Sequence, residues 1–286
     1  MATNGTKKRN AQRFARISDI TKEPHEMLMP ISGYENEPLV SLETAVQPLI
    51  PLLPTIQRYV DTSKERCKNP ADNLTQDESA SLMLYSMELK PASKSLYVVL
   101  NETLRSKDRQ NLKPWFSYLK LFLTALSRLP SERQFVYRGV KLDLSEKYPI
   151  GKNVVWWGFS SCTVSINVLQ SENFLGNKGE RTIFNIDCYS GKNIQKHSYY
   201  PTEDEVLLLA ATQFKIVGCL DNGGGSHTIH LKEIEPPFPL LQPVMPVINE
   251  ASSSETQSSS PLLEPVMFNS NPEPPSPGKS DEIFSH

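Results

Sequence analysis

Several features that would place a protein in a large functional class are missing from this sequence of 286 residues. Its 30 Lys and Arg residues nearly balance 32 Asp and Glu residues, so there is no strong overall field to attract nucleic acid or an acidic membrane surface. No apolar run approaches the roughly 18 residues of a membrane-spanning helix. We therefore expect neither nucleic acid nor a membrane as a partner.

Cysteine is scarce: the chain has four, which could form two disulfides in a secreted protein. The four cysteines contain no C-x-x-C pair. Residues 1–16 are polar and basic and lack the apolar segment of a signal peptide, so we expect a cytoplasmic chain with buried, reduced thiols. The basic residues of this leader leave nuclear import open. The cysteines are Cys67, Cys162, Cys188 and Cys219.

Motifs of several enzyme classes are also absent. There is no Gly-x-Gly-x-x-Gly fingerprint and no Walker loop, so a dinucleotide would not be bound in the Rossmann manner. There is no Gly-x-Ser-x-Gly elbow for a serine nucleophile. His227 and His230 share a predicted strand near a Gly-rich turn without a third clear ligand, so we expect no metal cofactor.

The spacing of apolar residues divides the chain into a helical part and a strand-rich part. Apolar residues first recur at helical spacing, and Thr75 and Glu78 form a capping-box pattern that predicts a helix start. β-branched and aromatic runs then indicate strands. Helices followed by strands predict an α+β fold. The expected parts are a disordered basic leader (1–24), a helical part (25–130), a β-rich part (131–235) and a disordered Pro/Ser-rich tail (236–286).

Proline and glycine refine this division. One helix is expected to open at Pro91 and another near Pro114, ending before Pro130. The segment 40–60 holds three prolines and should be short or kinked. The run Asp221-Asn222-Gly223-Gly224-Gly225 supplies the positive φ angles of a tight hairpin.

The tail contains a seven-residue repeat. Pro239-Leu240-Leu241-Gln242-Pro243-Val244-Met245 recurs as Pro261-Leu262-Leu263-Glu264-Pro265-Val266-Met267. Two linked copies raise effective concentration and would suit a bivalent docking peptide for a partner. A neutral duplication in an unconstrained tail is an equal alternative, and a scaffold whose function lies in these repeats also stays open.

Three stretches of the β-rich part carry residues suited to chemistry. Arg138 lies in an apolar strand, where a guanidinium needs an anion, and Gly139 beside it permits close approach of a ligand. Ser161 and Thr163 end another apolar strand on one face. Each stretch has an ordinary alternative, a structural salt bridge for the first and a simple strand end for the second.

The third stretch runs from Tyr200 to Leu209 and places three acids directly before an apolar run. Period-two spacing puts Glu203 and Glu205 on one face of a strand, where two like charges repel unless a cation or a ligand uses them. A strand edge protected by charge is the alternative.

Taken together, these stretches resemble the arginine-specific mono-ADP-ribosyltransferases of the Arg-Ser-Glu class, which animal enzymes share with cholera-like toxins. The resemblance covers roughly residues 75–235. Tyr137-Arg138-Gly139 resembles the arginine strand of the family, and Thr202 to Val206 resembles its Glu-x-Glu loop. Trp157 to Thr163 resembles its Gly-Phe-x-Ser-x-Ser segment, with Cys162 and Thr163 in place of the usual Thr and Ser. Phe174 and the loop Asn173 to Gly179 resemble its nicotinamide-binding segment.

The resemblance implies a fold in which a helical part packs on two small, mostly antiparallel sheets with an NAD cleft between them. It implies transfer of ADP-ribose from NAD to a protein substrate with an accessible arginine. By resemblance, Glu205 stabilises the ribose cation, Ser161 and Thr163 support it, and Arg138 binds the phosphates. Glu203 and Tyr200 would meet the incoming arginine, while Gly139 and Phe174 would contact the nicotinamide.

Two other readings use the same residues. Water in place of the arginine would make the protein an NAD glycohydrolase, and Glu203 favours the transferase over it. A non-catalytic NAD-binding interaction module is the second alternative, which the intact set of Arg138, Ser161 and Glu205 disfavours.

Overall fold

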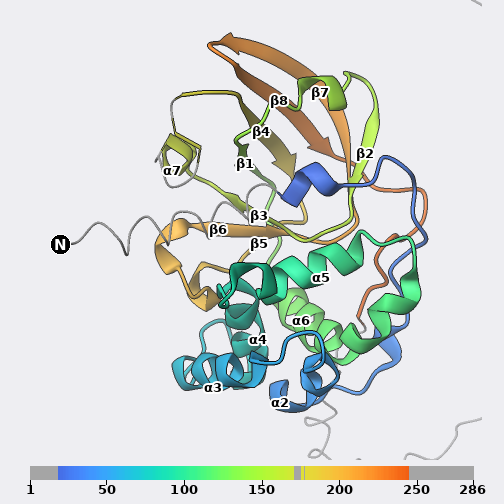
Figure 1. Cartoon of the computed structure of the whole chain (residues 1–286), viewed down its shortest axis with the longest axis vertical. Helices are drawn as coiled ribbons and strands as arrows, with labels where there is room; N and C mark the ends of the chain where they lie inside the picture. The colour runs from blue at the N-terminus through green and yellow to red at the C-terminus, as the bar shows by residue number, and fades with distance from the viewer. Residues whose placement is uncertain (1–18, 171–174, 177, 245–286) are drawn as a thin grey trace, which may run out of the picture. The chain divides into compact units, whose positions relative to one another are not determined.

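The computed structural model describes residues 19–170, 175–176 and 178–244. A helical half comes first along the chain and a strand-rich half follows (Figure 1), which confirms the predicted α+β class. The helices are α2 (Leu42–Ala45), α3 (Ile56–Arg66), α4 (Gln76–Ser86), α5 (Leu96–Leu104), α6 (Phe116–Arg128) and α7 (Ile166–Gln170). The strands are β1 (Gln134–Val140), β2 (Asn153–Trp156), β3 (Ser160–Thr163), β4 (Arg181–Cys188), β5 (Lys192–Asn193), β6 (Glu205–Leu208), β7 (Thr212–Gly223) and β8 (Ser226–Glu233).

Helix α4 lies at the centre of the helical half. Its start is the predicted capping box: the Thr75 hydroxyl accepts from the Glu78 amide at 3.2 Å, and the Thr75 amide donates to the Glu78 carboxylate at 2.8 Å. Because α2, α3, α5, α6 and the turn Gln195–His197 pack around it, most of α4 is buried, including its serines. A serine in such a position needs a hydrogen bond, and Ser81 and Ser86 each donate to a carbonyl one turn earlier.

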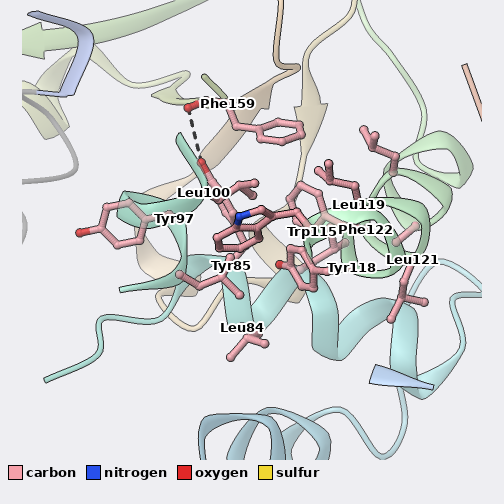
Figure 2. Close-up of a cluster of buried hydrophobic side chains, with 14 of the residues drawn as sticks. Leu84, Tyr85, Tyr97, Leu100, Trp115, Tyr118, Leu119, Leu121, Phe122 and Phe159 are labelled. Carbon is pink, nitrogen blue, oxygen red and sulfur yellow. Dashed lines mark hydrogen bonds between the residues drawn. The ribbon is translucent and has the colours of Figure 1, made fainter. Parts of the chain in front are cut away.

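An aromatic cluster joins this half to the sheet. Tyr85 of α4 and Phe122 of α6 lie 5.1 Å apart between ring centroids, and Phe159 packs on Phe122 edge-to-face at 5.1 Å (Figure 2). Phe159 belongs to the turn that enters β3, so its insertion among the helices fixes where β3 begins. Edge-to-face pairs of this kind add roughly 0.5–1.5 kcal/mol beyond the burial of their area.

The helix boundaries follow the prolines with one exception. Helix α6 begins just after Pro114 and ends just before Pro130, as predicted, and segment 40–60 is broken into short pieces. The exception is the helix that was predicted to begin at Pro91, which begins five residues later. Pro91 precedes a separate 3-10 turn, Ala92–Lys94, and α5 begins at Leu96.

The strands form one eight-stranded sheet in the order β2-β7-β8-β4-β1-β3-β6-β5. Every neighbouring pair is antiparallel except β4 and β8, so the mostly antiparallel character is confirmed. The prediction of two sheets was wrong in this detail. The link between β1 and β3 is a single residue pair, Tyr137 with Thr163, and this pair alone merges a five-stranded and a three-stranded group.

Hairpin β7–β8 turns where the glycines predicted it. Gly223, Gly224 and Gly225 all have positive φ angles, between 60° and 78°. Cys67, Cys162 and Cys188 are buried free thiols, and Cys219 is partly exposed. In the part of the chain that the structure describes, no helix is long and apolar enough to cross a bilayer.

The two segments predicted to be disordered, 1–24 and 236–286, both include residues that belong to the fold. Residues Asp19–Lys22 form a 3-10 helix, and Ile20 is buried in the core of the sheet. At the other end, Leu240 is 2% exposed and joins the core of the helical half. Residues 1–18 and 245–286 of the two predicted ends lie outside the described residues. Both segments are mostly polar in composition, so the few apolar residues that anchor them, such as Ile20 and Leu240, did not indicate a folded structure.

A truncation series should locate the C-terminal boundary of the fold. A chain ending at Pro246 keeps Leu240 and should unfold at the temperature of the full chain. A chain ending at Glu235 loses this buried leucine and should be destabilised by about 2–5 kcal/mol, the range for removing such a side chain. Thermal unfolding followed by circular dichroism checks both, and equal midpoints would show that segment 236–244 contributes nothing.

Candidate active site

The register of three strands brings the candidate residues together. Antiparallel pairing of β3 with β6 sets Thr163 opposite Glu205, and pairing of β1 with β3 sets Thr163 opposite Tyr137. Cross-strand partners have Cβ atoms about 4.5–5.5 Å apart. Arg138, Thr163 and Glu205 are all buried at this junction, at 3%, 5% and 3% exposure. The three sequence motifs therefore meet at one level of the sheet.

Arg138 is a buried cation that pairs with groups from distant parts of the chain. One Nη atom donates to the carbonyl oxygen of Ser161 at 3.1 Å, which ties β1 to β3. The other donates to the carboxylate of Asp19 in a short ion pair. A buried guanidinium without a counter-charge would be costly, so Asp19 neutralises it in this structure.

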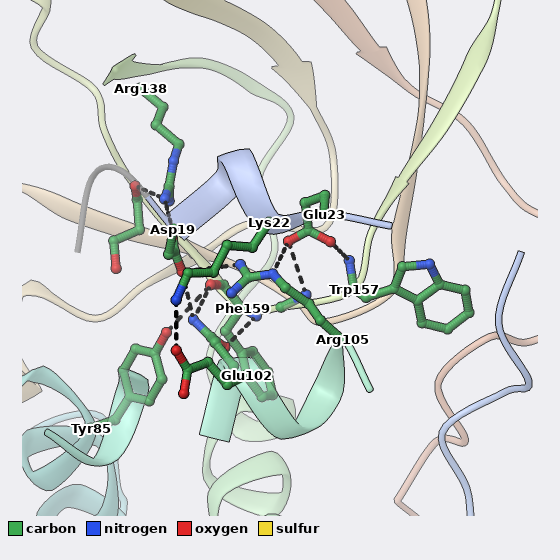
Figure 3. Close-up of polar contacts among 12 residues, drawn as sticks. Asp19, Lys22, Glu23, Tyr85, Glu102, Arg105, Arg138, Trp157 and Phe159 are labelled. Carbon is green, nitrogen blue, oxygen red and sulfur yellow. Dashed lines mark hydrogen bonds and ion pairs between the residues drawn. The ribbon is translucent and has the colours of Figure 1, made fainter. Parts of the chain in front are cut away.

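Asp19 belongs to a larger ion network that sequence reasoning missed (Figure 3). Arg105 directly follows α5. Its guanidinium contacts the carboxylate of Asp19 at 3.0 Å and that of Glu23 at 2.6 Å. Burial raises the pKa of Glu23, and the charge of Arg105 opposes that rise. Burial lowers the pKa of Arg105, but Asp19 and Glu23 outweigh this and raise it overall. Two buried cations thus share two carboxylates from segment 19–23.

The same network holds the backbone that leads into β3. Glu23 accepts from the amide of Trp157 at 2.6 Å. The side chain of Asn101 on α5 pairs with both the amide and the carbonyl of Phe159, each at 3.0 Å. A side chain at Gly158 would place its Cβ 2.6 Å from a guanidinium nitrogen of Arg105. Gly158 is therefore a glycine because Arg105 occupies its side-chain space.

Glu205 begins β6 and is held by the loop before it. Its carboxylate accepts from the hydroxyl of Ser198 at 3.2 Å, and the same hydroxyl accepts from the amide of Tyr200 at 3.1 Å. Ser198 is itself buried. Sequence reasoning gave this orienting role to Ser161 and did not identify Ser198, because seven positions and a loop separate Ser198 from Glu205.

That loop is anchored on helices α3 and α4. His197 lies within hydrogen-bond distance of Ser79 at 2.9 Å and of Asp72 at 3.2 Å. The Tyr199 amide donates to Ser86 at 2.7 Å, and Arg66 stacks over the Tyr199 ring at 4.2 Å. Burial lowers the pKa of His197, and its hydrogen bond to Asp72 opposes the shift. The helical half therefore supports the loop on which Tyr200 and Glu203 lie.

Glu203 does not lie on a strand, so the argument that it shares a strand face with Glu205 was wrong. It ends a 3-10 turn, Pro201–Glu203, and Asp204 after it has a left-handed backbone with φ 47° and ψ 48°. This conformation breaks the two-residue alternation. Glu203 is half-buried, whereas Glu205 is fully buried.

The remaining candidates are only partly covered by the described residues. A side chain at Gly139 would meet Leu175 at 3.2 Å, so Gly139 provides room for that leucine. Phe174 lies outside the described residues, as does most of the loop predicted to touch nicotinamide. Cys162 beside Ser161 is no nucleophile, because burial raises its pKa to about 12. In the described ranges, no three His, Cys, Asp or Glu residues lie close enough to hold a metal ion.

Replacing Asp19 by Asn should separate stability from anion binding. The variant removes a carboxylate that pairs with both Arg105 and Arg138, so it should unfold about 3–5 kcal/mol more easily. The uncompensated charge should also attract anions, so inorganic pyrophosphate should raise its unfolding temperature more than that of the parent. Calorimetry with and without pyrophosphate measures both effects. A matched control is Glu102→Gln, which removes an exposed ion pair with Lys22. If pyrophosphate stabilises D19N and the parent alike, Asp19 does not compete for Arg138.

Comparison with known proteins places this junction in a family. The family model described as NAD:arginine ADP-ribosyltransferase matches residues 54–236, well over half of the chain. The protein Mav of Mycobacterium avium (strain 104), named as an NAD(+)–arginine ADP-ribosyltransferase, is 29% identical over 150 residues, which are 52% of this chain and 17% of Mav. NAD(P)(+)–arginine ADP-ribosyltransferase 1 of Gallus gallus is 30% identical over 166 residues, which are 55% of this chain and 49% of that protein.

A solved structure extends the likeness to the fold. The eukaryotic mono-ADP-ribosyltransferase ART2.2, in a mutant form complexed with NADH, superposes with a TM-score of 0.50 at 19% identity. The match covers 69% of this chain and 86% of that one. The chain spans at most about half the length of the two curated relatives.

Proposed function

Because the chain belongs to the NAD:arginine ADP-ribosyltransferase family, we propose that it transfers ADP-ribose from NAD to arginine side chains and releases nicotinamide. The observation that carries this proposal is the junction of β1, β3 and β6 within the matched region, where the buried Arg138 follows Tyr137 in β1 and the buried Glu205 pairs with Thr163, the cross-strand partner of Tyr137. The curated relatives are named for this reaction, and the solved relative binds NADH, which supports NAD as the co-substrate.

In this proposal, Glu205 acts on the ribose of NAD. The bond between C1′ and the nicotinamide nitrogen breaks, nicotinamide leaves with the electron pair, and positive charge develops on the sugar, as in glycoside hydrolysis. A fixed, buried carboxylate stabilises that charge. The Ser198 hydroxyl holds the Glu205 carboxylate. Thr163 is the cross-strand partner of Glu205 and lies beside it.

Glu203 acts on the acceptor. A guanidine nitrogen attacks C1′ and must lose a proton as the new bond forms, and Glu203 accepts that proton. Its position at the end of a turn, where it is only half-buried, is suited to an acceptor arriving from solvent. Tyr200 directly precedes the turn, and its proposed role is to contact the same acceptor.

Arg138 is proposed to bind the phosphates of NAD. Its guanidinium is already paired with Asp19, so a phosphate must share this cation or displace the carboxylate. The carbonyl of Ser161 fixes the Arg138 side chain, and its hydroxyl is proposed to help hold Glu205. Gly139 and Phe174 remain proposed contacts of the nicotinamide.

The test is incubation of the chain with labelled NAD and agmatine, a small guanidine. We expect ADP-ribosyl-agmatine and nicotinamide in equal amounts. Nicotinamide with free ADP-ribose, and no labelled agmatine, would identify a glycohydrolase instead. Binding of NAD without any product would identify a non-catalytic module, and neither binding nor product would refute the assignment.

A further inference from the structure

The strongest feature outside the site is the place where the tail returns to the helical half. We propose that this place, the repeat seat, accepts either copy of the seven-residue repeat. The first copy, Pro239–Met245, occupies it in the structure as far as Val244, and the second copy, Pro261–Met267, is its alternative occupant from the same chain. The seat consists of Ile31, Tyr34 and the side chains packed around Leu240.

The first copy is held by a short parallel bridge to Ile31. The Ile31 amide donates to the carbonyl of Leu240 at 2.7 Å, and the amide of Gln242 donates to the carbonyl of Ile31 at 3.0 Å. The hydroxyl of the buried Tyr34 donates to the carbonyl of Gln242. All three contacts use main-chain atoms of the repeat, so any segment of the same backbone shape can make them.

Side chains then select which segments fit. Leu240 is 2% exposed and packs in the core of the helical half, and Leu241 and Val244 pack against that core half-buried. The second copy supplies Leu262, Leu263 and Val266 at the corresponding places. Its prolines recur at the same positions and impose the same φ angles.

The two copies differ in sequence at one position, and the side chain at this position makes none of the three hydrogen bonds that hold the first copy. Glu264 corresponds to Gln242, whose observed bonds to Ile31 and Tyr34 come from its backbone. Gln and Glu have nearly the same size and the side chain at this place is half-exposed. A glutamate there keeps its contact with water and needs no new partner.

The surroundings of the segment also permit exchange. A cavity of about 430 Å³ runs along the first copy, between it and residues such as Leu126, Tyr189 and Ala211. The first copy therefore borders open space and is not packed tightly on every side.

Chain length decides which copy prevails. The first copy follows the last strand-linked residue, Ile234, after four residues, whereas the second follows after 26. Loop-closure entropy with a 3/2-power dependence then favours the first copy by roughly 15-fold. The second copy is accordingly a minor occupant that takes over when the first is weakened.

The test uses three variants of the full chain. One carries Leu240→Asp with Leu241→Asp in the first copy, the second carries Leu262→Asp with Leu263→Asp in the second copy, and the third combines all four. Because the two pairs are the same change in the same repeat, each is the matched control of the other. The readouts are the unfolding midpoint and the hydrogen exchange of the Ile31 amide, which is protected by whichever copy is seated.

We expect the second-copy variant to behave as the parent. The first-copy variant should lose about 5 °C and keep protection at Ile31, since the second copy replaces the first. The combined variant should lose at least about twice as much and lose that protection. A combined variant that fails to fold, beside a folded first-copy variant, supports the proposal equally.

Three outcomes would overturn it. The first-copy and combined variants can lose the same stability and protection, which would make the first copy the sole occupant. The first-copy variant can fail to fold, which would mean that the second copy does not replace it. Protection in that variant can instead depend on protein concentration and accompany dimers in light scattering, which would show that the seat is filled by the repeat of another molecule.

Discussion

Replacing Glu205 by Gln should reduce both nicotinamide release and arginine modification by at least about a hundredfold, or about 2.7 kcal/mol of barrier. Glu205 is 3% exposed, so water screens its charge poorly and its effect on a developing cation is large. Gln keeps the shape, and its carbonyl can still accept from the hydroxyl of Ser198. The loss would therefore report the charge rather than the shape of the side chain.

The control for Glu205 is Ser198→Ala. This variant keeps the carboxylate and removes its observed hydrogen-bond donor, so turnover should fall much less, by about tenfold, through loss of orientation. Steady-state assays of nicotinamide and of ADP-ribosyl-agmatine, with unfolding midpoints for each variant, complete the comparison. Turnover near the parent level in a folded E205Q would remove Glu205 from the mechanism.

Replacing Glu203 by Gln should separate the two half-reactions. A guanidinium is fully protonated near neutral pH and is a poor nucleophile in that state. A glutamine can orient the acceptor but cannot take its proton, so agmatine modification should fall by about a hundredfold or more. Cleavage of NAD depends on charge at the ribose, which Glu205 supplies, so slow nicotinamide release should continue near the parent rate.

Asp204→Asn is the matched control for Glu203. It removes one negative charge from the same turn, and asparagine tolerates the left-handed backbone that Asp204 adopts. It can also still accept the hydrogen bond from Gln195. Modification in D204N should stay within about threefold of the parent, because this charge has no part in proton transfer. If E203Q loses nicotinamide release as strongly as modification, Glu203 serves NAD binding and the case for arginine as the acceptor weakens.

The features that sequence reasoning recovered are those set by neighbours in the chain. Thr75 and Glu78 are three residues apart and form their capping box locally. The hairpin glycines 223–225 act through their own backbone angles. The strand that carries Arg138 follows from its own apolar pattern. Resemblance then placed Arg138, Thr163 and Glu205 in one site, and the register of β1, β3 and β6 brings them to one level.

What sequence reasoning missed depends on contacts between distant positions or on a single backbone angle. Asp19 and Arg138 are 119 positions apart, and nothing in a polar leader indicates that one of its carboxylates neutralises a buried cation. Glu203 was misplaced because one left-handed residue, Asp204, interrupts the alternation. Leu240 was assigned to a disordered tail because its buried environment is supplied by residues 31–34, about 200 positions earlier.

The contact between Gly158 and Arg105 restricts how related chains can diverge. A Cβ at position 158 would lie 2.6 Å from the guanidinium, so a larger residue there would push Arg105 away from its two carboxylates unless position 105 carries a shorter side chain. Without Arg105, the carboxylates of Asp19 and Glu23 would lose a shared cation and would have to change as well. Positions 19, 23, 105 and 158 should therefore covary as one group across an alignment. Homologues that combine alanine at 158 with arginine at 105, and keep both acids, would contradict this coupling.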